Sequence, residues 1–155
     1  MTYFFSELGC GTGVVGLVAA KMGAKVRLTD LEVYLQPVKE NIEANRDIIT
    51  KGEAIADTLD WGEKVPENLH HSADIILISD CIYYEMSLEP LISVMNNLVH
   101  SESVVILSYE ERPEKLQLYE TFFKMIRECY KVLLERQFTI ENGNKVSIIK
   151  MTSEI

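Results

Sequence analysis

Glu7-Leu8-Gly9-Cys10-Gly11-Thr12-Gly13 is the stretch that decides the fold of this 155-residue chain. An apolar run at residues 3–8 leads into it and predicts a strand, and the apolar run that follows at residues 14–22 predicts a helix. Glycine permits positive φ angles, and its missing Cβ lets a ligand approach the backbone. The N-terminus of the following helix offers free N–H groups. The stretch therefore predicts a strand–turn–helix unit built around a ligand.

Strands and helices alternate along the rest of the chain. Further strands are predicted at residues 25–29, 53–59, 73–79 and 103–108, and further helices at residues 31–42, 88–98 and 116–133. Ser87 is a suitable N-cap for the helix at residues 88–98. Asn142-Gly143 separates two last strands, at about residues 132–140 and 146–151, and predicts an antiparallel hairpin. The alternation predicts an α/β, Rossmann-like fold with a mostly parallel twisted sheet. The length fits a single domain over residues 1–155.

Composition excludes several classes of partner. The net charge of −9 argues against a nucleic-acid or anionic-membrane surface, because lysine and arginine hold both. No apolar run reaches the roughly 20 residues of a membrane span, and no signal-peptide pattern is present. The three cysteines lack CxxC spacing and form no metal-ligand set with the three histidines. We therefore expect no metal, and reduced thiols in the cytoplasm or the nucleus.

The glycine motif fits two nucleotide-type cofactors. Gly11-Thr12-Gly13-Val14-Val15-Gly16 matches G-x-G-x-x-G, and Asp30 follows at the end of the next predicted strand. A nicotinamide dinucleotide and S-adenosylmethionine both present a ribose diol to such an acid. Glu7 favours the second cofactor, because a carboxylate beneath the turn repels a diphosphate but suits an ammonium and a sulfonium. A dinucleotide, or a tight turn without a ligand, stays as the alternative.

Other candidate site residues follow the later strands. Asp80 ends a fully apolar predicted strand, where a carboxylate is costly unless it is paired or faces a cleft; Tyr83 could share that cleft. A lysine amine, with a pKa near 10.4, is about 4 kcal/mol from its neutral form at physiological pH. A carboxylate and an aromatic ring could bind the incoming cation and then orient its lone pair. The alternative for Asp80 is an N-cap of a short turn. Trp61 could cover an aromatic ligand or pack in the core. Ser79 ends the fourth predicted strand at the same sheet edge as Gly9 and Asp30, which makes it a candidate neighbour of the cofactor.

Several stretches together resemble one enzyme family. They are Glu7-Leu8-Gly9-x-Gly11-Thr12-Gly13, Thr29-Asp30-Leu31-Glu32, Leu59-x-Trp61-Gly62-Glu63, Asp80-Cys81-Ile82-Tyr83-Tyr84-Glu85 and, after the fifth predicted strand, Tyr109-Glu110-x-Arg112. The chain is similar to the seven-β-strand (class I) protein-lysine methyltransferases, most of all to the member that modifies valosin-containing protein. The more specific signal is Asp80-x-x-Tyr83, which matches the D-x-x-Y motif of that family.

The resemblance implies a set of roles. The implied cofactor is S-adenosylmethionine. Its methionine end would lie against Gly9, Cys10 and Gly11, and Asp30 would hold its ribose. Its adenine would lie near Trp61 and Ser79. Asp80 and Tyr83 would line a lysine channel. The implied reaction is methyl transfer to a lysine Nε of a protein, with a valosin-containing-protein-type AAA ATPase or an Hsp70-type chaperone as the partner. The alternatives are a small-molecule or histidine N-methyltransferase and an inactive cofactor-binding or partner-binding form. Because the family also has an upstream Trp-containing segment, we expect an N-terminally truncated domain.

Overall fold

The computed structural model describes residues 3–154, which form a seven-stranded sheet in the order β3-β2-β1-β4-β5-β7-β6. Its first five strands pair in parallel, and β7 pairs antiparallel with both β5 and β6. The strands are β1 (Phe4–Leu8), β2 (Lys25–Asp30), β3 (Glu53–Thr58), β4 (Ile75–Ser79), β5 (Val104–Glu111), β6 (Tyr130–Thr139) and β7 (Lys145–Ser153). The predicted α/β sheet with a C-terminal hairpin is confirmed.

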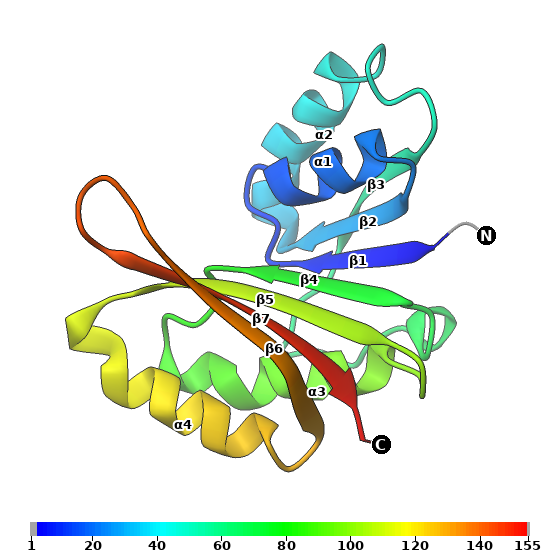
Figure 1. Ribbon diagram of the computed structural model, residues 1–155. Helices are drawn as coiled ribbons and strands as arrows, with labels where there is room; N and C mark the ends of the chain where they lie inside the picture. Colours follow the sequence, from blue (N-terminus) through cyan, green and yellow to red (C-terminus); the bar gives the residue numbers. More distant parts are fainter. Residues whose placement is uncertain (1–2, 155) are drawn as a thin grey trace.

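Helices cover both faces of this sheet. On one face, α1 (Val14–Lys21) and α2 (Leu35–Ala44) lie over β1, β2 and β3, while α3 (Leu88–Leu98) and α4 (Leu116–Ile126) lie on the other (Figure 1). Short 3₁₀ turns complete the connections: η1 (Glu32–Tyr34), η2 (Glu67–Leu69), η3 (Glu85–Ser87) and η4 (Pro113–Lys115). Within residues 3–154, no helix is both long enough and apolar enough to cross a bilayer.

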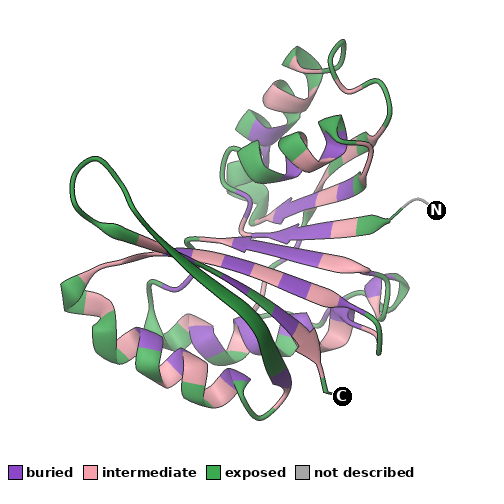
Figure 2. Cartoon of the chain, viewed as in Figure 1, coloured by how far each residue is buried: buried purple, intermediate pink, exposed green. Residues whose placement is uncertain are grey.

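The side chains that alternate along each strand build two separate cores. Phe5 of β1 and Val26 and Leu28 of β2 face α1 and α2 and form the smaller core. Leu8 belongs to the larger core, between the sheet and α3 and α4. The central strands are buried, whereas β6 is exposed along almost its whole length (Figure 2). The buried middle of the sheet holds the strand ends that carry the candidate site residues.

The structure corrects the predicted end of the last helix. The apolar stripe predicted a helix to residue 133, but α4 ends at Ile126, and Tyr130 opens β6 as a buried residue. Tyr130 is the point where helical and strand patterns overlap, since an apolar residue there fits both periods. Ladder hydrogen bonds to β7 decide for the strand.

Two smaller expectations also differ from the structure. Ser87 lies at the N-cap position of α3, but its hydroxyl donates to the Tyr84 carbonyl at 2.7 Å and caps no N–H. The reason is η3, whose helical turn precedes α3 directly and leaves Ser87 with helical φ and ψ. In addition, β5 continues to Glu111, so that Tyr109 and Glu110 are part of the strand and do not follow it.

Candidate functional site

A cleft of about 820 Å³ opens at the carboxyl ends of the parallel strands. It lies where the strand order reverses, with β1 between β2 and β4, which is the usual ligand position in an open α/β sheet. Its volume is within the range of small-molecule and cofactor sites. The lining residues are Gly9, Gly11, Thr12, Asp30, Leu31, Tyr34, Pro37, Leu59, Asp60, Trp61, Gly62, Tyr83, Tyr84, Met86, Ser87 and Pro90.

Gly11 leaves room for a ligand in the glycine turn. Its φ is +55°, and a Cβ built there would meet no protein atom within 4 Å. The turn is tied to β2 because the Cys10 N–H donates to the Thr29 carbonyl at 2.9 Å. A backbone that is held in place and bare on its cleft side can be approached closely by a bound molecule.

The other glycines of the motif serve close packing. A Cβ on Gly9 would lie 2.8 Å from Cys81 Sγ and 3.1 Å from the ring of Trp61. A Cβ on Gly16 would lie 2.5 Å from the carboxylate of Glu7. The motif therefore has two functions, since Gly11 opens the cleft while Gly9 and Gly16 let side chains come up against the backbone.

Glu7 lies beneath the turn and is 2% exposed. Its Oε2 accepts a hydrogen bond of 2.9 Å from the N–H of Gly16, the third residue of α1. Burial raises the pKa of the carboxyl to about 7, although the hydrogen bond from Gly16 acts in the opposite direction. The Glu7 carboxylate thus already accepts from one of the N–H groups that a helix N-terminus would otherwise offer to a phosphate. Glu7 is not among the residues that line the cleft.

Asp30 and Trp61 both line the cleft. The Asp30 carboxylate accepts hydrogen bonds from the N–H of Gly11 at 2.9 Å and of Leu31 at 2.8 Å. A carboxylate has about four acceptor positions, so a diol can still donate to it. The half-buried Trp61 packs against the larger core, and the edge of its indole lies over Gly9. An acid and an indole ring therefore meet the bare backbone of Gly11 in one cleft.

Asp80 and Tyr83 lie on the loop between β4 and α3. Asp80 has a φ of +55°, which is uncommon for a residue with a side chain. Its N–H donates to the Ser108 carbonyl at 2.8 Å, and its carboxylate accepts from Nη2 of Arg112 at 2.7 Å. Tyr83 lines the cleft, and burial raises the pKa of its hydroxyl. Asp80 is outside the lining, about half exposed, and three residues from Tyr83.

Cys10 and Ser79 have surroundings that differ from the rest of the set. Burial raises the pKa of the Cys10 thiol to about 12, so it is neutral, and its side chain belongs to the smaller core. Ser79 Oγ accepts a hydrogen bond from Ser108 Oγ at 3.1 Å across β4 and β5. Neither residue is part of the cleft lining. Among residues 3–154, no group of three or more His, Cys, Asp and Glu side chains has a metal-binding arrangement.

Sequence reasoning missed several residues at the mouth of the cleft. Tyr34, Tyr84 and Met86 line it and are 57%, 63% and 86% exposed. Each of the three follows a strand that ends at this edge of the sheet. That position in the sequence could have indicated that they lie at the cleft. An exposed aromatic or methionine side chain beside a cleft is typical of a surface that contacts a partner.

The cleft fits S-adenosylmethionine better than a dinucleotide. Asp30 can accept from a ribose diol, Trp61 offers an indole near it, and the space beside Gly11 admits a ligand chain. A diphosphate would instead meet Gly16, whose N–H already donates to a buried carboxylate. The residues present therefore fit a cationic, phosphate-free nucleoside.

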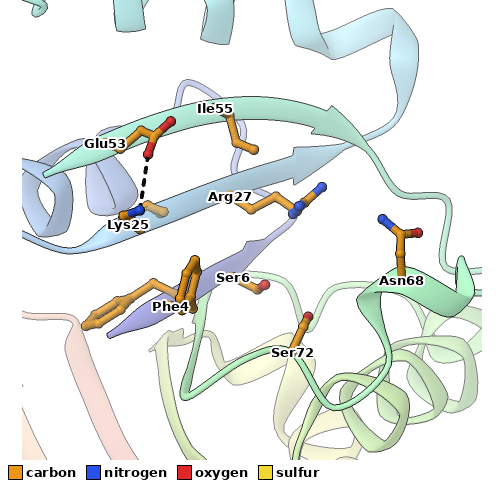
Figure 3. Close-up of a pocket in the computed structure, with 10 residues that line it drawn as sticks. Phe4, Ser6, Lys25, Arg27, Glu53, Ile55, Asn68 and Ser72 are labelled. Atoms are coloured by element: carbon orange, nitrogen blue, oxygen red, sulfur yellow. Dashed lines mark ion pairs between the residues drawn. The ribbon is translucent and has the colours of Figure 1, made fainter. Parts of the chain in front are cut away.

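A second hollow, of about 430 Å³, lies on the sheet face away from α1 and α2 (Figure 3). Phe4 and Ser6 of β1 and Lys25 and Arg27 of β2 form part of its floor. Both cations are paired within the sheet, Lys25 with Glu53 at 3.9 Å and Arg27 with Asp57. This hollow contains none of the predicted site residues and leaves no unpaired cation for an anionic ligand.

Comparison with known proteins points to one family. Residues 5–129 match the sequence model of a family described as lysine methyltransferase. The mouse protein N-lysine methyltransferase METTL21A is 36% identical over 134 residues, which cover 86% of this chain and 56% of the mouse protein. The mouse EEF1A lysine methyltransferase 3 is 33% identical over 123 residues, which cover 77% of this chain and 50% of that protein. The chain spans about half the length of these curated relatives.

Solved structures share the fold at low sequence identity. The PH0226 protein of Pyrococcus horikoshii has a TM-score of 0.76 at 13% identity, and the match covers 99% of this chain and 83% of that one. The magnesium protoporphyrin IX methyltransferase of Synechocystis, solved with bound SAH, has a TM-score of 0.70 at 15% identity, covering 97% of this chain and 74% of that one. These likenesses show the architecture of the chain.

Proposed function

The chain belongs to the lysine methyltransferase family, and we propose that it transfers a methyl group from S-adenosylmethionine to the Nε atom of a lysine in a protein. The observation that carries the proposal is one cleft in which Gly11, Asp30 and Trp61 lie beside Tyr83 of the Asp80-x-x-Tyr83 motif. A cofactor site and an acceptor site need to adjoin for direct transfer.

The cofactor would be held by the residues around the glycine turn. Asp30 would accept from the ribose hydroxyls, Trp61 would cover the adenine, and Gly9 and Gly11 would line the methionine end. Cys10, in the smaller core, and Ser79, hydrogen-bonded to Ser108, would support the methionine and adenine ends from behind the cleft lining. Glu7 would act from beneath, because a buried carboxylate favours the positive charges of the ligand. When bound, S-adenosylmethionine supplies a methyl group on a positively charged sulfur, and the amine lone pair takes it as the carbon–sulfur bond electrons leave with sulfur.

Asp80 and Tyr83 would receive the acceptor amine. A lysine arrives mostly protonated, and a carboxylate beside an aromatic ring attracts such a cation. Removing water from the amine lowers its pKa, and acceptors around it direct the lone pair. Positioning and the exclusion of water supply most of the rate in this scheme. Asp80, half exposed and three residues from Tyr83 of the cleft lining, is suited to meet the cation first.

The substrate is proposed on two grounds. The exposed Tyr34, Tyr84 and Met86 beside the cleft suit contact with a protein surface, and the net charge of −9 favours a basic segment around the lysine. We take a valosin-containing-protein-type AAA ATPase and an Hsp70-type chaperone as the first candidates, in the cytoplasm or the nucleus. The similarity to the mouse EEF1A lysine methyltransferase 3 adds an elongation factor of the EEF1A type.

Mass spectrometry of modified substrates tests the proposal. The chain is incubated with S-adenosylmethionine and each purified candidate, and the site of any added methyl group is read from peptide fragmentation. Methyl on a lysine supports the proposal; methyl on a histidine, or on a small molecule alone, contradicts it.

Asp80→Asn is the matched variant for this experiment. We expect transfer to be lost while the affinity for S-adenosylhomocysteine, measured by calorimetry, stays within about fivefold, since Asp80 would meet the acceptor and not the cofactor. Equal loss of both would make Asp80 a structural residue. Cofactor binding with no transfer to any candidate would indicate a cofactor-binding form of the domain.

A further inference from the structure

Two cations join the loop that carries Asp80 and Tyr83 to the connection between β5 and α4. Arg112 Nη2 lies 2.7 Å from the Asp80 carboxylate, across 32 residues of sequence. Lys115 Nζ donates to the Tyr83 carbonyl and lies 5.7 Å from the centre of the Tyr84 ring. The acid and the tyrosine of the motif are therefore each attached, at separate points, to the segment from Arg112 to Lys115.

Arg112 is itself held by the strand end from which it projects. Its Nη2 also lies 3.2 Å from Glu110, whose other carboxylate oxygen accepts from Asn144 at the turn of the β6–β7 hairpin. The Tyr119 hydroxyl of α4 donates to the Glu110 carbonyl at 2.8 Å. The Arg112 side chain is 29% exposed, and its contacts with Asp80 and Glu110 hold it at this position.

The backbone of Asp80 shows why such a partner is needed. Aspartate enters the left-handed region more readily than most residues with a side chain, but the conformation still has to be held by surrounding contacts. The contacts that enforce it here are the hydrogen bond from Asp80 N–H to Ser108 and the ion pair to Arg112. Without the guanidinium, the half-exposed carboxylate would lose its fixed direction.

The ion pair also sets the charge that an acceptor amine meets. Asp80 and Glu110 are negative and Arg112 is positive, so these three carry one net negative charge. Lys115 adds a positive charge beside Tyr83, and substitutions at Arg112 leave it in place. A bare carboxylate would attract a lysine ammonium but would also keep it protonated. A positive charge about 7 Å from an amine, at an effective dielectric constant of about 40, lowers the amine pKa by about one unit. Arg112 thus favours the neutral lone pair that methyl transfer needs.

We infer that Arg112 is a positioning residue for the acceptor site, which fixes the Asp80 carboxylate and offsets its charge so that a bound lysine can lose its proton to water. The inference rests on the proposed function, because it assigns Asp80 to the acceptor amine. The other titratable groups around Asp80 and Tyr83 are the same in all the variants compared below. They are Asp30, Tyr34, Cys81, Tyr84, Glu110, Glu114, Lys115 and Tyr119.

The test compares Arg112→Gln and Arg112→Lys with the parent chain, with Arg46→Gln as the matched control. Arg46 forms a surface ion pair with Glu43 at the end of α2, away from the cleft. The rate of lysine methylation is measured from about pH 7 to about pH 10, on whichever candidate protein the parent modifies. S-adenosylhomocysteine affinity is followed by the fluorescence of Trp61, which is the single tryptophan of the chain.

For Arg112→Gln we expect kcat/KM near neutral pH to fall by about tenfold, and the midpoint of its rise with pH to move up by about one unit. Arg112→Lys keeps the charge and should keep the parent midpoint, and S-adenosylhomocysteine should bind all variants equally. A midpoint that does not move in Arg112→Gln overturns the inference. Absence of transfer by the parent chain is a different result, which contradicts the proposed function.

A double-mutant cycle measured by thermal unfolding tests the coupling between Arg112 and Asp80 without an activity assay. Arg112→Gln should lower the thermal unfolding midpoint by about 2 °C in the parent chain. In the Asp80→Asn background the same change should have a clearly smaller effect, because only the pairing of Arg112 with Glu110 is then left to lose. Equal shifts in the two backgrounds would mean that Arg112 and Asp80 are uncoupled, which would overturn the inference.

Discussion

At the scale of single residues, the glycines of the motif divide into those that open the cleft and those that allow packing. Gly11 has empty space where a Cβ would lie, whereas Gly16 has the Glu7 carboxylate there, at 2.5 Å. The sequence motif alone does not distinguish the two roles, because both positions are glycine. What distinguishes them is the neighbour that the fold brings to each one.

This division predicts opposite outcomes for two alanine substitutions. Gly16→Ala should lower the free energy of unfolding by about 2 kcal/mol, through overpacking against Glu7 and Leu28. Gly11→Ala should cost only about 1 kcal/mol for its positive φ, but should weaken S-adenosylhomocysteine binding strongly. Thermal unfolding and calorimetry measure the two effects.

Gly23→Ala is the control for backbone strain. Gly23 also has a positive φ, of +110°, and the nearest atom to its added Cβ is 3.8 Å away, on Lys51. Gly23 does not line the cleft. It should lose stability and keep its affinity. If Gly11→Ala keeps its affinity as well, the ligand does not lie against Gly11.

Glu7 gives a prediction about pH. Burial raises its folded-state pKa from 4.5 to about 7, so the folded protein holds this proton more tightly than the unfolded chain. Stability therefore falls as the pH rises from about 4.5 to about 7. Glu7→Gln keeps an acceptor for the Gly16 N–H and removes the charge. The variant should be more stable than the parent at pH 8, by about 3 kcal/mol at most, and nearly equal at pH 5.

Denaturant unfolding at the two pH values measures this difference. Glu7→Gln should also bind S-adenosylmethionine more weakly, since the carboxylate would attract the ligand charges. A stability gap of the same size at both pH values would show that Glu7 does not titrate as its burial indicates.

At the scale of elements, the C-terminal hairpin is determined by a few local residues. The Gly143 N–H donates to the Ile140 carbonyl at 2.8 Å, and the Ile140 N–H donates to the Asn144 carbonyl. Gly143 has a φ of +86°, as in three-residue hairpins in which a turn is followed by a left-handed residue. The Asn142-Gly143 signal works because the turn needs that conformation at one position.

Gly143→Ala should therefore destabilise the protein by about 1 kcal/mol. Nothing lies within 4 Å of the added Cβ, so the backbone conformation would be the whole cause. Gly143→Asn should recover much of the loss, because asparagine tolerates the left-handed region. Unfolding free energies of the two variants check this, and equal losses would mean that φ is not the reason.

At the scale of the whole molecule, the cleft is assembled from both halves of the chain. Residues from the ends of β1 and β2 face Tyr83, Tyr84 and Met86 from the loop after β4. Helices α1 and α2 support the first group from one face of the sheet, and α3 continues from the second group on the other (Figure 1). A ligand in the cleft should therefore stabilise the complete fold.

We expect S-adenosylhomocysteine at about a hundred times its dissociation constant to raise the free energy of unfolding by about 2.7 kcal/mol. Trp61 fluorescence should change on binding, since its indole lines the cleft. NAD at the same concentration serves as the control and should have no effect. Stabilisation by NAD alone would restore the dinucleotide interpretation of the glycine motif.

The sequence by itself determined the alternation of strands and helices, the glycine turn and the hairpin. These features depend on φ preferences and on hydrophobic periods, which act within a few residues. Where two local patterns overlapped, as at Tyr130, the sequence could not place the boundary between α4 and β6. The ladder between β6 and β7 supplied that information.

Only the tertiary structure decided what the acids face. Glu7 and Asp30 are both acids on neighbouring strands, yet one is buried beneath α1 and the other lines the cleft. Likewise, Asp80 meets Arg112 because β4 and β5 pair in parallel with their carboxyl ends together. Burial and ion pairing between such residues depend on strand order and on the face to which each side chain points, and both are set by packing across the whole sheet.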